Sequence, residues 1–243
     1  NANYEWYTKC IDNLLKLDYK KYHIAVSGCK TSDDTRKKLY ERYKGKISFC
    51  FTENYLTTNV TFNLTVKKCV ERFGSFDGYV YLNSGVNVTS NYNLLTEIDN
   101  RINTNKYGVV TVQTDTDQTH VKDEDYIMPI GKNCNMYAFA FTDELREAYN
   151  GKLIPDIFNV YCVETVISLL LAAIKKQWVV IKDITLTHNK EEEDNVPANY
   201  LGTEKLYSSV DVNELLNDPK AKEVGIDDIL TQKYIVHNPN LFT

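Results

Sequence analysis

The sequence lacks the features that mark membrane-spanning and nucleic-acid-binding proteins. No apolar run approaches the roughly 20 residues that a membrane-spanning helix needs. The formal net charge of −5 leaves no basic surplus of the kind that binds nucleic acid. The chain also contains neither the glycine-rich dinucleotide-binding motif nor the P-loop motif. We therefore expect a protein with no transmembrane segment and no nucleic-acid partner.

The six cysteines show no C-x-x-C spacing, which disfavours a zinc site or a disulfide framework. Several lie within apolar runs, so we expect small buried side chains in a reducing, cytoplasmic compartment. They are Cys10, Cys29, Cys50, Cys69, Cys134 and Cys162. Glycosylation sequons begin at Asn59, Asn63 and Asn87. Because the chain is rich in Asn throughout, chance sequons are expected, and these three do not indicate secretion.

Strands and helices are predicted to alternate along most of the chain. The predicted strands are 22–26, 47–51, 79–82, 108–112, 136–141 and 178–187, and the predicted helices are 3–17, 33–43, 63–73, 94–102, 143–149 and a helix from Pro155. This alternation indicates an α/β fold with a mostly parallel central sheet covered by helices on both faces. We expect one domain over residues 1–190, with the helix in 1–20 packed on it. Residues 191–243 are predicted to be a linker and a helical extension.

The stretch from Pro155 to His188 reads as a helix followed by a buried strand. Pro155 suits the first position of a helix, because a backbone N–H at this position makes no hydrogen bond within the helix and its absence costs nothing. Glu164 is the one acid in the apolar start of this helix, and His188 follows the strand. Both side chains could face one cleft. The alternative is that Glu164 only caps the helix, where its dipole favours a carboxylate, and that His188 is a surface loop residue.

Short polar segments follow several predicted strands, at the end where α/β proteins bind ligands. Ser27-Gly28 follows the first strand, Glu53-Asn54 the second, and Asn83-Ser84-Gly85 the third. The strand 108–112 leads into a long polar segment that contains Asp115 and Asp117. A segment of this length without its own secondary structure is usually functional or disordered.

The order of these segments resembles the nucleotide-sugar glycosyltransferases of the GT-A fold over about Tyr22 to Asn189. Residues 76–86 look like the central strand of that family running into its Asp-x-Asp motif. The resemblance implies that Ser27, Gly28, Glu53, Asn54, Asn83, Ser84 and Gly85 bind the donor nucleotide. It also implies that Glu164 is the catalytic base, with Asp156 as second candidate, and that Tyr137 and Tyr161 contact the acceptor.

The family's Asp-x-Asp is replaced here by Asn83-Ser84-Gly85, and Gly85 offers no ligand to a metal ion. Mg²⁺ and Mn²⁺ prefer oxygen ligands. Three interpretations stay open. A divalent metal is held elsewhere, by Asp115 or Asp117 with His188. The enzyme works without metal, using basic side chains or helix N-termini to offset the diphosphate charge. Or the fold is kept while catalysis is lost.

The resemblance implies a glycosyltransferase that moves a hexosyl or pentosyl group from a UDP- or GDP-sugar to a glycan acceptor, as in polysaccharide biosynthesis. The first alternative is a non-catalytic nucleotide- or carbohydrate-binding domain of the same fold. The second is a sugar-phosphate nucleotidyltransferase. That class carries a glycine-rich basic loop after its first strand, which Ser27-Gly28-Cys29-Lys30 matches poorly.

Overall fold

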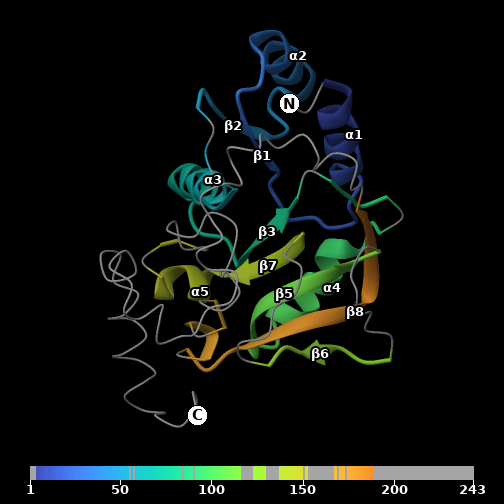
Figure 1. Ribbon diagram of the computed structural model, residues 1–243, viewed down its shortest axis with the longest axis vertical. Coiled ribbons are helices and arrows are strands. Elements are labelled where there is room, and N and C mark those ends of the chain that lie inside the picture. Colours follow the sequence, from blue (N-terminus) through green and yellow to red (C-terminus); the bar gives the residue numbers. More distant parts are fainter. Residues whose placement is uncertain are drawn as a thin grey trace, which may run out of the picture.

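The computed structural model describes residues 4–54, 56, 58–83, 85–89, 91–115, 123–129, 137–149, 151–152, 167–168, 170–172 and 174–188. Helices and strands alternate along these residues (Figure 1). Their order is α1 (Tyr4–Leu14), β1 (Ala25–Cys29), α2 (Asp33–Tyr43), β2 (Ser48–Thr52), α3 (Thr58–Phe73), β3 (Gly78–Leu82), β4 (Val86–Asn87), α4 (Leu94–Ile102), β5 (Tyr107–Thr114), β6 (Tyr126–Ile127), β7 (Ala138–Thr142), α5 (Asp143–Ala148) and β8 (Gln177–His188). None of the described helices is long and apolar enough to cross a membrane.

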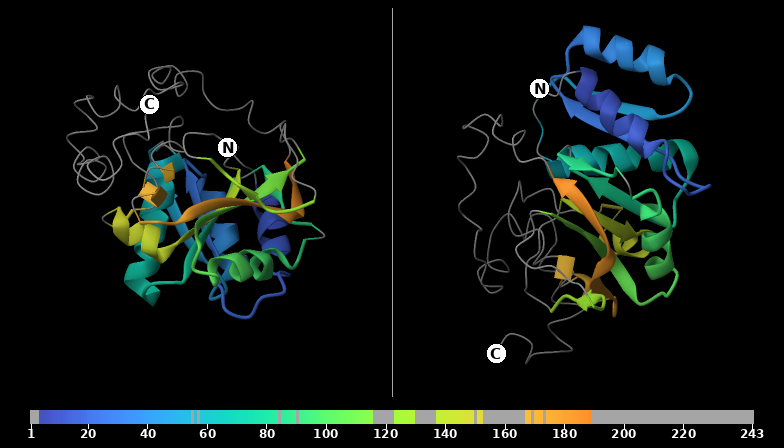
Figure 2. Two further views of the ribbon diagram at one scale, coloured as in Figure 1. Left: turned by 90° about the horizontal axis from the view of Figure 1, so that it is seen from below. Right: turned by 90° about the vertical axis from the view of Figure 1, so that its right-hand side faces the viewer.

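The strands form a small sheet and a large one. In the small sheet β1 and β2 pair in parallel, from Ala25 opposite Ser48 to Cys29 opposite Thr52. The large sheet has the order β3-β7-β5-β8-β4, with β6 paired to the other end of β8. Figures 1 and 2 show the small sheet with α1 and α2 at one end of the molecule and the large sheet at the other.

The predicted α/β class is confirmed, with a central sheet that is not purely parallel. β5 and β8 pair in parallel, whereas β7 is antiparallel to both β3 and β5. It follows that β3, β5 and β8 all run in one direction and that β7 runs against them. The carboxyl ends of β3, β5 and β8 therefore lie at the same edge of the sheet, where β7 begins.

Each sheet has its own apolar core. Around the large sheet, Val110 of β5, Ala140 of β7 and Val179 of β8 are fully buried, and Leu94 and Ile98 of α4 pack against them. The strands β5 and β7 are buried along almost their whole length. The second core joins α1, α2 and the small sheet through Ile11, Ile24, Leu39, Tyr43 and Ile47.

The first strand begins later than the sequence pattern predicts. The expected strand was 22–26, whereas β1 spans Ala25–Cys29. Ser27 and Gly28 therefore lie within the strand, opposite Cys50 and Phe51, and not in a turn after it. Close packing explains the glycine, because a Cβ on Gly28 would collide with the hydroxyl oxygen of Tyr7 and lie 2.8 Å from the Oγ1 of Thr31.

The last strand is one 12-residue element with an irregularity in its pairing to β5. Val112 is opposite Ile181, but the next residue, Gln113, is opposite Thr185. Three residues of β8 are thus extra at this point, as in a β-bulge. The side chain of Gln113 donates to the carbonyl of Ile181 at 2.9 Å, which satisfies a backbone group next to the bulge.

Candidate functional site at the strand ends of the large sheet

Five predicted site residues meet at the edge where β3, β5 and β8 end. We call this group the strand-end cluster, and it consists of Asn83, Gly85, Asp115, Tyr137 and His188. Asn83 follows β3, Asp115 follows β5, and His188 is the last residue of β8. Tyr137 directly precedes β7, which runs in the opposite direction. The strand directions derived above are what bring these four strand ends together.

The turn after β3 is held by its own asparagine. The side-chain oxygen of Asn83 accepts the backbone N–H of Gly85 at 2.9 Å, and its carbonyl accepts the N–H of Val86 at 2.9 Å. An asparagine side chain that bonds to the backbone two residues on is a common way of making a tight turn. The backbone N–H of Asn83 donates to the carbonyl of Tyr137 at 2.8 Å. This turn is thereby fixed to the start of β7.

Asp115 and His188 are joined directly. The backbone N–H of His188 donates to the Oδ1 of Asp115 at 2.9 Å, and the N–H of Asp115 donates to the carbonyl of Leu186 at 2.9 Å. His188 is also opposite Val86 in the β4–β8 pair. The His188 side chain is buried, and its ring stacks on that of Tyr137 with centroids 4.0 Å apart and an interplanar angle of 25°. Asp115 itself is exposed to solvent.

The other predicted donor-binding residues lie on the small sheet. Glu53, directly after β2, forms an ion pair with Arg36 of α2. The hydrogen bond and the charge of this guanidinium lower the pKa of Glu53 below its ordinary value. The hydroxyl of Thr52 donates to the carbonyl of Asn54 at 3.0 Å. Ser27, Gly28, Glu53 and Asn54 therefore form a second group, on a different sheet from the strand-end cluster.

The remaining predicted residues lie outside the described part of the chain. These are Ser84, Asp117, Asp156, Tyr161 and Glu164. The proposed base and the second acceptor tyrosine thus stay predictions from the sequence.

Two arginines that form ion pairs in the structure were not singled out from the sequence. Arg36 pairs with Glu53, and its guanidinium carbon lies 5.8 Å from the ring centre of Phe51. Arg101 of α4 bonds to Glu97, Asp125 and Asp183, the last of which lies in the β8 bulge. The four-residue spacing of Glu97 and Arg101 on one helix was a usable signal for an ion pair. The other partners are distant in sequence and gave no such signal.

The described residues contain no group of three or more His, Cys, Asp or Glu side chains placed to hold a metal ion. They do contain the adjacent pair of Asp115 and His188. Mg²⁺ in particular is commonly held by one or two carboxylates together with the phosphates of a substrate. In this pair the contact runs from the backbone N–H of His188 to the Asp115 carboxylate, and the role of the two side chains as metal ligands stays a prediction from the sequence.

The chain matches no protein-family model and no curated protein by sequence. It does match solved structures. Staphylococcus aureus TarS residues 1–349 in complex with UDP-GlcNAc superposes with a TM-score of 0.59 at 13% identity, covering 97% of this chain and 70% of that one. The mannosyltransferase PcManGT of Pyrobaculum calidifontis, in complex with GDP-Man and Mn²⁺, gives 0.56 at 12% identity, covering 96% and 66%.

A third structure, GalNAc-T7 with UDP, GalNAc and Mn²⁺, gives a TM-score of 0.52 at 10% identity and covers 73% of this chain and 40% of that one. Identities this low show a shared fold and no more. The chain therefore has the Rossmann-like α/β fold of the GT-A glycosyltransferases.

Proposed function

We propose that the chain is a glycosyltransferase that moves a sugar from a nucleotide-diphosphate sugar to a glycan acceptor. The observation that carries the proposal is the strand-end cluster. Polar residues predicted from the sequence to bind donor, metal and acceptor come from four strands and meet at one sheet edge. The fold in which they meet is shared with structures that hold UDP-GlcNAc and GDP-Man.

The proposed reaction breaks the bond between the sugar and the diphosphate, and negative charge develops on the departing nucleoside diphosphate. Groups positioned at developing charge are usually the largest source of rate enhancement. Asp115 and His188 would hold a divalent cation beside the diphosphate, and this cation would offset that charge. Ser27, Gly28, Glu53 and Asn54 on the small sheet, with the Asn83–Gly85 turn, would hold the nucleoside of a UDP- or GDP-sugar.

On the acceptor side, Glu164 would take the proton from the attacking hydroxyl, with Asp156 as the second candidate, and Tyr161 would contact the acceptor sugar. A general base contributes about 10²–10⁴-fold to a rate. Glu164→Gln should therefore lower the transfer rate by about that factor and leave donor affinity unchanged. The measurement is release of the nucleoside diphosphate alongside donor titration. Glu71→Gln, an exposed change on α3, is the matched control.

His188→Ala should weaken binding of donor in the presence of Mn²⁺ and reduce its dependence on the metal. Metal binding requires a neutral imidazole or a carboxylate, so losing one of two protein ligands reduces affinity. Titration calorimetry of donor with and without Mn²⁺ measures both effects. A variant that binds donor and metal like the parent would remove His188 from the site.

The alternative function is a non-catalytic nucleotide-sugar-binding domain. Gly85 favours it, because the resemblance stated for the sequence implies a metal-binding acid at this position and glycine supplies no ligand. The same assay separates the two functions. Saturable donor binding with neither transfer nor hydrolysis, across a panel of glycan acceptors, would favour the binding domain.

A further inference from the structure

Tyr137 connects three of the strand ends at the candidate site. Its backbone carbonyl accepts the N–H of Asn83 at 2.8 Å, which fixes it to the turn after β3. The next residue, Ala138, is fully buried and pairs with Leu82 of β3. The ring of Tyr137 stacks on the imidazole of His188 at the end of β8, with a centroid distance of 4.0 Å. The position of the Tyr137 ring is therefore set by the sheet.

The main chain of His188 is fixed on two sides, but its ring needs a further constraint. Pairing with Val86 and the hydrogen bond to the Asp115 carboxylate hold the backbone. The two side-chain torsions of a histidine still decide where its ring nitrogens point. An aromatic ring lying at 25° to the imidazole over 4.0 Å leaves little room for the imidazole to rotate. Tyr137 thus restricts rotation of the His188 imidazole, which the backbone contacts do not fix.

We propose that Tyr137 is a positioning residue for His188, and that its ring rather than its hydroxyl does the positioning. This inference rests on the proposed function, in which His188 binds the cation and diphosphate of the donor. It assigns Tyr137 a role different from the acceptor contact expected from the sequence, because one face of the ring is already covered by the imidazole. Residues that orient a metal ligand typically contribute about 10–100-fold to metal affinity or activity.

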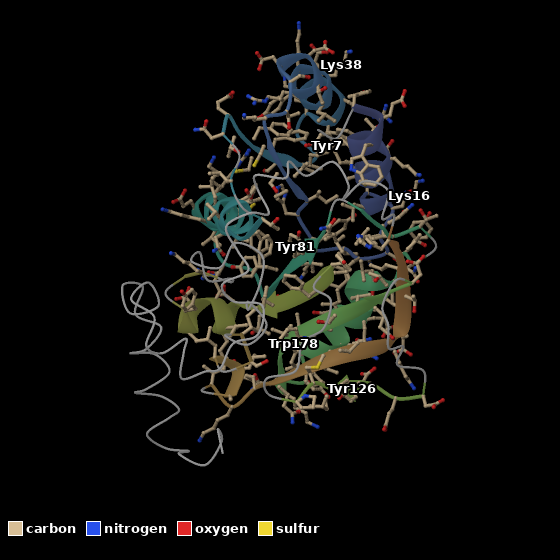
Figure 3. All side chains as sticks on the ribbon, in the orientation of Figure 1. Tyr7, Lys16, Lys38, Tyr81, Tyr126 and Trp178 are labelled. Carbon is tan, nitrogen blue, oxygen red and sulfur yellow. The ribbon has the colours of Figure 1, made fainter. Side chains whose placement is uncertain are left out.

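The test uses Tyr137→Phe, which keeps the ring and loses the hydroxyl, and Tyr137→Leu, which loses the ring. Tyr126→Leu is the matched control, since Tyr126 is an exposed tyrosine of β6, at the far end of the molecule from α1 (Figure 3). The first readout is proton NMR of the imidazole signals at one fixed pH, without ligand. The chain has four histidines, so the His188 signals are assigned by their loss in His188→Gln. The second readout is the affinity for UDP or GDP in the presence of Mn²⁺.

Stacking over an aromatic face moves imidazole proton signals upfield. We expect this shift in the parent, in Tyr137→Phe and in Tyr126→Leu, and its loss in Tyr137→Leu. We also expect Tyr137→Leu alone to bind the nucleotide about 10–100-fold more weakly. If Tyr137→Leu loses the upfield shift but keeps the nucleotide affinity of the parent, the positioning role is overturned and the proposed function stays intact. A parent that shows the upfield shift but binds neither nucleotide would overturn the proposed function, and this inference with it.

Discussion

Arg101 forms ion pairs with three carboxylates, more than any other residue in the described part of the chain. Its guanidinium bonds to Glu97, to Asp125 at 3.0 and 3.2 Å, and to Asp183, and its side chain is only 14% exposed. These contacts hold α4, the segment before β6 and the β8 bulge together. Without the guanidinium, three carboxylates would face one another at short range.

Arg101→Met keeps the apolar stem and removes the charge. We expect it to lower the free energy of unfolding by about 1–2 kcal/mol, less than for a deeply buried pair because the group stays partly hydrated. Urea unfolding measures the change. Lys38→Met, which removes an ion pair with Asp34 between exposed side chains, is the control and should have a much smaller effect. Equal midpoints for the two variants would contradict this account.

Because the pKa of Asp125 differs between the folded and the unfolded chain, the stability that the Arg101 contacts provide depends on pH. Burial alone would raise this pKa, but the hydrogen bonds from Arg101 and from the backbone N–H of Lys182 outweigh it and hold the pKa below its ordinary value. The unfolded chain therefore binds the proton more readily than the folded chain. The stabilisation is complete above the ordinary carboxyl pKa of about 4 and is lost as the pH falls through the lower folded value.

We accordingly expect the unfolding free energy of the parent to fall on acidification below about pH 4, and to fall less steeply in Arg101→Met. Urea midpoints across the acidic range give both slopes. Identical slopes would mean that the Arg101 contacts do not lower the pKa of Asp125 in solution.

At the scale of elements, a buried hydrogen bond between two side chains links β5 and β8. The indole N–H of Trp178 donates to the Oγ1 of Thr111 at 2.7 Å inside the large sheet, where Figure 3 labels Trp178. Thr111→Val keeps the shape and removes the acceptor. An orphaned buried donor costs about 1–3 kcal/mol, so the variant should unfold at correspondingly lower urea concentration.

Thr96→Val is the control for this variant, because the hydroxyl of Thr96 bonds to the carbonyl of Asp18 at an exposed position. Water can satisfy the carbonyl that this change releases. A Thr111→Val variant as stable as Thr96→Val would show that the indole finds another partner.

The sequence predicted individual elements best where the local signal was complete. The helix 94–102 was predicted at its observed bounds, because its apolar residues recur at helical spacing. In the structure Leu94 and Ile98 of this helix are buried. The first strand was placed three residues early, since Tyr22, His23 and Ile24 suit a strand but the ladder with β2 begins at Ala25. The bulge in β8 depends on Gln113 and Asp125, which are distant in sequence.

At the scale of the whole molecule, the α/β class followed from the alternation of elements, but the site did not follow from it alone. The pattern placed Asn83, Asp115 and His188 at strand ends. Their meeting depends on β3, β5 and β8 running one way with the antiparallel β7 inserted between β3 and β5. No periodicity within β7 encodes that direction, so the contact between Tyr137 and His188 required the structure.

A thermal-shift titration tests most directly the proposal that this chain binds a nucleotide-sugar donor. A ligand that binds only the folded chain raises its stability by an amount that grows with the logarithm of its concentration relative to its dissociation constant, about 2.7 kcal/mol at 100 times that constant. We expect UDP-GlcNAc or GDP-Man with Mn²⁺ to raise the melting temperature of the parent, and to raise it less in His188→Ala. No shift with any nucleotide or nucleotide sugar, with or without Mn²⁺ or Mg²⁺, would contradict the account.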